Sequence, residues 1–203
     1  MTIGHYTCNV KRKISREDIL NSGLRLMFVN GYNATGIKEI TESISIPKGS
    51  FYNHFTNKEE FGLEVVKMYC DNGVKMYEAV FLNKDVTPLK RVRGFFDRLI
   101  GVYRNELNFK LGCVMGNFST EMSDTNENFR VLLDDEFNRC ENVITMCLEE
   151  AQANGEISKD IQPSQLAAFL LNSWHGAMLR MKTTENSKPL EDCRDLIMNK
   201  ILV

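Results

Sequence analysis

The sequence predicts an all-α protein of about nine helices. Apolar residues recur at three- and four-residue spacing along most of the chain, which is typical of helices with one buried face. No segment alternates apolar and polar residues for long, and runs of β-branched residues are absent. The 203 residues include only four prolines, and no low-complexity linker or internal repeat interrupts the pattern. Helices are expected at about 19–30, 37–43, 47–55, 58–81, 88–109, 113–123, 126–154, 163–184 and 189–202.

Local signals define the first four helices. Gly31 follows the last apolar residue of the first helix and predicts its end. Thr35 can N-cap the second helix, and Pro47 suits the first turn of the third, where its missing N–H would be unpaired in any case. Asn57 or Thr56 is expected to cap the long fourth helix.

The segment from Ile37 to Phe55, which holds the second and third helices, is expected to form a helix-turn-helix. Phe51 and Phe55 lie four residues apart and should face the core. A helix can enter the major groove of DNA when its outward side chains are modest in size and can form hydrogen bonds. The residues that meet this requirement are Lys48, Gly49, Ser50, Tyr52, Asn53 and His54.

Charge is distributed unevenly along the chain. The net charge is only −2, yet residues 1–58 hold eight Lys or Arg against four Asp or Glu. The N-terminal part is basic and the rest of the chain is acidic, which indicates that only the N-terminal part contacts the phosphates of a nucleic acid. Lys11, Arg12 and Lys13 form either a DNA-binding arm or a solvated tail, and the sequence leaves both open.

Residues with fixed spacings run through the same region, and they are Gly31-Tyr32, Thr35, Ile37, Ile40, Ile46, Lys48-Gly49-Ser50-Phe51-Tyr52, His54-Phe55 and Lys58-Glu59. Together they resemble the signature of the tetracycline-repressor (TetR) family. The resemblance implies a DNA-binding domain over 1–57, a ligand and dimerisation domain over 58–203, and a palindromic operator released by a small molecule. By position, it implies that the DNA backbone is contacted by Thr35, Lys48, Tyr52, His54 and Lys58. It implies that Gly49, Ser50 and Asn53 face the groove.

The turn of the motif departs from the family pattern. Ser45 stands where the family usually has Gly, and Ile44 stands where a small residue is usual. A left-handed backbone at this point would cost Ser about 1 kcal/mol relative to Gly. We therefore expect a slightly altered turn within an intact motif.

Cys113 is the candidate for a chemical sensor. It follows Gly112 and opens a predicted helix, where the helix dipole and free N–H groups favour a thiolate. A thiolate reacts with quinones, aldehydes and hypohalous oxidants, and Lys182 would lower the thiol pKa further if it lay nearby. The alternative is that Cys113 is a small buried residue at a helix start. Residues 112–121 and 176–182 also resemble one TetR subfamily, which includes repressors of reductases for reactive electrophiles.

Aromatic and methionine side chains in the C-terminal part could line an apolar pocket or belong to an ordinary core. They are Phe95, Phe96, Tyr103, Met115, Phe118, Phe137, Trp174 and Met178. A reversible apolar aromatic ligand in such a pocket is therefore the alternative to cysteine chemistry. Cys140 and Cys147 share a helix face, but with only His175 as a further ligand they are expected to be core thiols. No metal or cofactor is expected.

The helix at 163–184 carries an apolar stripe with small residues at Ser173, Gly176 and Ala177. We expect it to pair with the helix at 189–202 in a homodimer, although burial inside a monomer is an alternative. No membrane-length apolar run and no signal peptide are evident, which predicts a cytoplasmic protein. No enzyme motif such as GxSxG or HExxH is found. A helical interaction protein without DNA binding is the last alternative, and a steep salt dependence of binding to one palindrome would exclude it.

Overall fold

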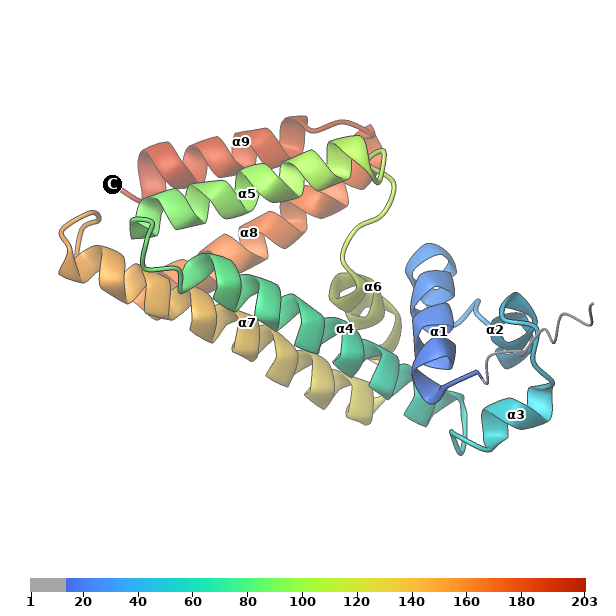
Figure 1. Cartoon of the computed structure of the whole chain (residues 1–203). Helices are drawn as coiled ribbons and strands as arrows, with labels where there is room; N and C mark the ends of the chain where they lie inside the picture. The colour runs from blue at the N-terminus through green and yellow to red at the C-terminus, as the bar shows by residue number, and fades with distance from the viewer. Residues whose placement is uncertain (1–13) are drawn as a thin grey trace, which may run out of the picture.

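The computed structural model describes residues 14–203, which fold into helices without any strand, so the predicted all-α class is confirmed (Figure 1). Lys11, Arg12 and Lys13 lie outside the described residues. The elements are α1 (Arg16–Asn30), α2 (Ile37–Ser43), α3 (Lys48–Tyr52), α4 (Lys58–Phe81), α5 (Pro88–Asn105), α6 (Val114–Met122), α7 (Glu127–Ala153), α8 (Pro163–Thr184), α9 (Lys188–Leu196) and a π-helical turn at Ile197–Ile201.

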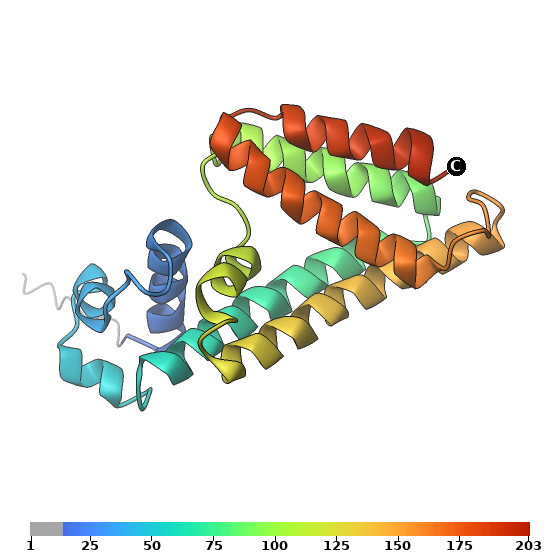
Figure 2. The same ribbon diagram turned by 180° about the vertical axis from the view of Figure 1, so that it is seen from behind.

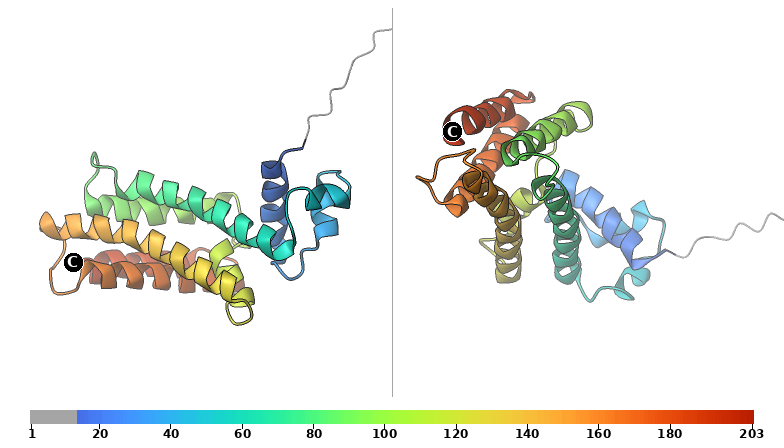
Figure 3. Two further views of the ribbon diagram at one scale, coloured as in Figure 1. Left: turned by 90° about the horizontal axis from the view of Figure 1, so that it is seen from below. Right: turned by 60° about the vertical axis from the view of Figure 1, so that its left-hand side comes forward.

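The helices form a small head and a long body of two layers (Figures 1 and 2). The head consists of α1, α2 and α3. In the body, α4 and α7 lie side by side along the length of one layer, while α5, α8 and α9 form the second layer (Figure 3). The short helix α6 lies between the body and α1, so it links the two parts.

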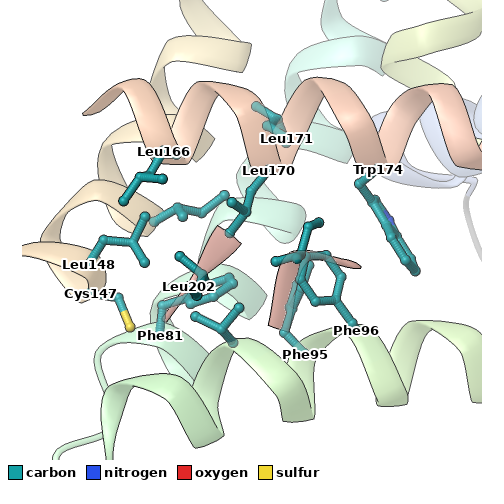
Figure 4. Close-up of a cluster of buried hydrophobic side chains, with 14 of the residues drawn as sticks. Phe81, Phe95, Phe96, Cys147, Leu148, Leu166, Leu170, Leu171, Trp174 and Leu202 are labelled. Carbon is teal, nitrogen blue, oxygen red and sulfur yellow. The ribbon is translucent and has the colours of Figure 1, made fainter. Parts of the chain in front are cut away.

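The head shares its hydrophobic core with the body. Phe51 of α3 packs on Phe61 of α4 with ring centroids 5.1 Å apart. Tyr32, in the turn after α1, packs on Phe118 of α6 and Phe129 of α7 at 5.6 and 5.1 Å. A second core fills the far end of the body, where α5, α8 and the C-terminal turn meet (Figure 4). Helix α6 is therefore in direct contact with side chains of the head.

The predicted cap of α4 is confirmed, since the Asn57 side-chain oxygen accepts a hydrogen bond from the Glu60 N–H at 2.9 Å. The altered turn expected at Ser45 is not found. Ser45 has a φ of 55°, so the helix-turn-helix turn uses a left-handed backbone without glycine.

The prediction that Thr35 caps α2 is wrong. Gly36 occupies the N-cap position, and the Thr35 side chain is fully buried. Its hydroxyl donates a hydrogen bond to the Gly31 carbonyl at 2.8 Å, which closes the turn after α1. Thr35 therefore braces this turn from within, and its side chain cannot reach DNA.

Three helix ends differ from the predictions. Pro47 is the N-cap of α3 and not a first-turn residue, and α3 ends at Tyr52 before Phe55. The helix expected to reach 109 ends at Asn105, because Asn108 and Phe109 adopt positive φ values of 48° and 59°. The last helix extends close to its predicted end, with its final turn, Ile197–Ile201, in π-helical form. Across residues 14–203, no helix is long and apolar enough to cross a membrane.

Gly62 of α4 is expected to be intolerant of any side chain. A Cβ atom at this position would lie 2.5 Å from Tyr32 Cε2 and 2.9 Å from Phe129 Cζ. Because both rings are buried, we expect Gly62→Ala to destabilise the fold by about 1–3 kcal/mol, measured by urea unfolding. Gly94→Ala is the control, since nothing lies within 4 Å and alanine should add about 0.5–1 kcal/mol of helix stability. Equal effects of the two variants would contradict this packing.

Candidate DNA-binding face and sensor site

The outward face of α3 brings the predicted groove residues together. Phe51 is fully buried against Phe61, which orients the short helix, whereas Tyr52 is 49% exposed. The other predicted residues on this face are exposed or partly exposed, and they are Lys48, Gly49, Ser50, Asn53 and His54. The face contains one cation, small groups and several hydrogen-bonding side chains, a composition suited to DNA.

Lys58 does not belong to the face of α3. Its ammonium group donates a hydrogen bond to the Asn33 carbonyl at 3.3 Å and lies 4.4 Å from the centre of the Tyr32 ring. The side chain is thus attached to the turn between α1 and α2 and is partly buried.

Cys113 is the N-cap residue of α6 and lies between two hollows. Its carbonyl accepts the first helical hydrogen bond, from the Asn117 N–H at 2.9 Å. The inner hollow is an apolar cavity of about 90 Å³ between α4, α5, α6, α7 and α8. The outer hollow, of about 270 Å³, lies between α6 and α8. Cys113 and His175 line both hollows, so the thiol can be reached from either side.

The surroundings of Cys113 favour its thiolate. Burial raises the pKa of this thiol, but the combined effect of its neighbours is larger and holds the pKa below the ordinary value. The favourable neighbours are the hydrogen bond and charge of His175, the Gly116 backbone N–H and the Tyr69 hydroxyl, which lies 3.8 Å from Sγ. Burial lowers the pKa of His175, yet its interaction with Cys113 raises it overall. The pair therefore favours thiolate and imidazolium.

Every other cysteine in residues 14–203 has the opposite shift. Burial raises the pKa of Cys70 and Cys193, that of Cys140 to about 12 and that of Cys147 to about 11. These four are free thiols held in the protonated form. Cys113 is therefore the one cysteine of residues 14–203 whose surroundings lower the thiol pKa.

Five of the eight predicted pocket residues lie together, and three predictions are wrong. Tyr103, Met115, Phe137, Trp174 and Met178 line the inner cavity with Cys113. Phe118 instead packs between Tyr32 and Phe129 in the core shared with the head. Phe95 and Phe96 belong to the core of the body and do not line the cavity, although Phe96 lies beside Trp174 with centroids 4.8 Å apart. Aromatic spacing along a helix does not reveal which of two cores a ring joins.

Lys182 lines the outer hollow, where its ammonium group lies 3.5 Å from the Asn117 side-chain oxygen. The group that favours the thiolate is His175, which sequence reasoning considered only as a metal ligand. His175 lies on α8 just before the apolar stripe residues Ala177 and Met178, so the sequence places it on this helix. Its pairing with a residue on α6 is a tertiary contact that spacing along one helix cannot predict.

Glu121, near the end of α6, contacts the head and was missed by sequence reasoning. Its carboxylate accepts hydrogen bonds from the backbone N–H groups of Tyr32 and Asn33 at 3.3 and 2.9 Å. Gly31 makes room for it, because a Cβ there would lie 2.2 Å from the carboxylate and φ is +85°. Helix α6 therefore begins at Cys113 and, near its other end, contacts the turn that precedes the helix-turn-helix.

His175→Asn is expected to slow alkylation of Cys113. Removing the imidazolium removes the main favourable interaction of the thiolate, so the pKa of Cys113 should rise and its reaction rate at pH 7 should fall about tenfold or more. Iodoacetamide labelling of the Cys113 peptide, followed by mass spectrometry from pH 5 to 9, measures the shift. His54→Asn, an exposed change, is the control. If the rate of Cys113 labelling depends on pH in the same way in wild type and His175→Asn, the pairing of Cys113 with His175 is refuted.

Known proteins match both parts of this architecture. The family described as bacterial regulatory proteins, tetR family, matches residues 19–65, and the tetracyclin repressor-like C-terminal domain matches residues 88–197. The transcriptional repressor DhaR of Mycobacterium sp. is 32% identical over 187 residues, which cover 92% of each chain. The repressor NemR of Escherichia coli is 27% identical over 194 residues, which cover 92% of this chain and 94% of NemR.

A solved structure agrees with these matches. The regulatory protein TetR from Rhodobacter sphaeroides superimposes with a TM-score of 0.85 at 31% identity, covering 94% of this chain and all of the other. The chain belongs to the TetR family and is a DNA-binding transcriptional repressor of the helix-turn-helix type, not an enzyme. Members of this family act as dimers on operator DNA and respond to small molecules.

Proposed function

We propose that this repressor leaves a palindromic operator when a thiol-reactive electrophile or oxidant modifies Cys113. The observation that carries the proposal is the position of the thiol, which is partly exposed, paired with His175 and located at the N-terminus of the helix that reaches the head. Modification adds atoms where α6 and α8 are in contact, and it removes the charge pairing with His175.

In the proposed complex, α3 of each protomer lies in the major groove. Lys48, Tyr52 and His54 contact phosphates, while Ser50 and Asn53 reach base edges beside the small Gly49. Lys58 of α4 can contact a phosphate only beside the α1–α2 turn, where its ammonium group lies. A homodimer presents the two heads one helical turn of DNA apart, in the cytoplasm where the operator lies. Exposed apolar side chains support dimerisation through α8 and α9, and they include Phe169, Leu179 and Leu196.

The proposed route from sensor to DNA is helix α6. A shift of its first turn at Cys113 moves Glu121 relative to Tyr32 and Asn33, so the head rotates against the body. Two heads that miss the one-turn spacing cannot dock together.

Glu121→Gln is expected to weaken this coupling. The amide keeps the size of the side chain but loses the charge-assisted hydrogen bonds to the two N–H groups. Operator affinity should change less than about threefold, whereas the fraction of operator released at full Cys113 modification should fall, as measured by fluorescence anisotropy. Glu127→Gln, on the exposed first turn of α7, is the control. Full release by the Glu121 variant would exclude α6 as the route through this contact.

N-ethylmaleimide and N-ethylsuccinimide test the covalent mechanism. The two compounds have nearly the same shape, but only the maleimide adds to a thiol. The proposal expects release of operator by the maleimide that persists after dialysis, and no release by the succinimide. The second candidate, reversible control by an apolar ligand, is favoured by the inner cavity itself and would appear as release that dialysis reverses.

A further inference from the structure

One buried polar atom in the described part of the chain lacks a hydrogen-bond partner. Among buried side-chain nitrogen and oxygen atoms of residues 14–203, it is the indole Nε1 of Trp174. Trp174 is 2% exposed, and Figure 4 shows its ring extending from α8 toward α5 beside Phe96. A buried N–H without an acceptor is unfavourable, and native proteins keep few of them.

Trp174 is part of the wall of the inner cavity, and two neighbouring hydroxyl groups have partners. The Tyr103 hydroxyl donates to Met178 Sδ at 2.8 Å, and the Tyr69 hydroxyl lies 3.8 Å from Cys113 Sγ. The remainder of the wall is mostly apolar. Trp174, whose Nε1 lacks a hydrogen-bond partner, is therefore part of a mostly apolar cavity wall.

We propose that this cavity binds a small uncharged carbonyl compound whose oxygen accepts a hydrogen bond from Trp174 Nε1. A carbonyl oxygen supplies the missing acceptor, and the apolar lining disfavours a ligand with a net charge. The volume of about 90 Å³ limits the ligand to one smaller than benzene, which occupies a protein cavity of about 150 Å³. Short-chain ketones and aldehydes meet all three conditions.

The same site would hold a reactive carbonyl compound next to Cys113. This step rests on the proposed function. In an α,β-unsaturated ketone, the Cys113 thiolate adds to the β-carbon and the C=C electron pair moves toward the carbonyl, which gives an enolate. The Trp174 N–H stabilises the enolate oxygen, and the α-carbon then takes the proton held by His175. The net change is addition of S–H across the double bond, so no oxidant or reductant is needed.

Reversible binding tests the site without covalent chemistry. The protein with Cys113→Ser is labelled with ¹⁵N and titrated with 2-butanone, and in parallel with 2-methyl-1-butene, which has CH₂ in place of the carbonyl oxygen. Because Trp174 is the single tryptophan of the chain, its indole N–H gives one assignable signal. We expect this signal to move downfield with the ketone and not with the alkene. Trp174→Phe should lower the ratio of ketone to alkene affinity about tenfold.

An indole signal that stays in place at saturating ketone would overturn the inference, as would equal losses of ketone and alkene affinity in Trp174→Phe. The covalent arm uses methyl vinyl ketone on the chain that retains Cys113. If the ketone shifts the indole signal but methyl vinyl ketone leaves Cys113 unmodified, the binding site stands and the proposed covalent function fails. If Cys113 is alkylated equally fast in wild type and Trp174→Phe, the role of the indole in presenting the electrophile is refuted.

Discussion

Replacing Gly49 by Glu is expected to abolish specific operator binding while leaving the fold intact. Gly49 lies on the exposed face of α3, and a Cβ atom added there would have nothing within 4 Å, so the new side chain starts in open space. A carboxylate in the first turn is favourable for the helix but is repelled by phosphates. Each head loses roughly 1–3 kcal/mol, and a dimer has two heads, so affinity should fall by about thirtyfold or more.

Gly94→Glu is the matched control for this charge change. Gly94 is exposed on α5, also has nothing within 4 Å, and belongs to the body layer away from α3. Fluorescence anisotropy with a labelled operator should show wild-type affinity for Gly94→Glu and none for Gly49→Glu. Similar affinities for both variants would mean that α3 does not enter the groove.

Cys113→Ser is expected to make the repressor insensitive to electrophiles. Serine preserves the N-cap position of α6, where its hydroxyl is a good cap, so operator binding should remain normal. A hydroxyl at neutral pH is not a nucleophile for these reagents, so the electrophile dose for release should rise by about a hundredfold or more. Operator anisotropy during titration with N-ethylmaleimide measures the dose.

Cys193→Ser is the control for loss of a thiol. Cys193 on α9 is partly exposed, as Cys113 is, but burial raises its pKa. Its replacement should leave the dose unchanged. If the N-ethylmaleimide dose for operator release is unchanged in Cys113→Ser as well, the sensor is another residue or a reversible ligand.

Features that depend on neighbouring residues in the chain could be predicted from the sequence. The Asn57 cap and the inward Phe51 follow from local hydrogen bonding and helical spacing. The same is true of Cys113 at the start of α6, because Gly112 and the following apolar residues mark a helix N-terminus. The family resemblance added the DNA-binding role of α3 and the two-part organisation.

Features that depend on contacts between distant segments could not be predicted. His175 is separated from Cys113 by α6, α7 and the first half of α8, and the Glu121 contact joins α6 to a turn far earlier in the chain. Phe118 satisfies the same spacing rule as the cavity aromatics but packs on Tyr32 in the other core. Thr35 precedes a helix, which favours a capping role, yet burial directs its hydroxyl back to Gly31. In each case a tertiary contact selected one of several local possibilities.

The central claim is that modification of Cys113 is the event that releases DNA. It is tested most directly by adding N-ethylmaleimide stepwise to the protein–operator complex and measuring, in each sample, the bound operator by anisotropy and the occupancy of each of the six cysteines by mass spectrometry. The account predicts that bound operator falls in proportion to Cys113 modification, before the other thiols react. Operator that stays bound when Cys113 is fully modified, or that is released before Cys113 reacts, would contradict it.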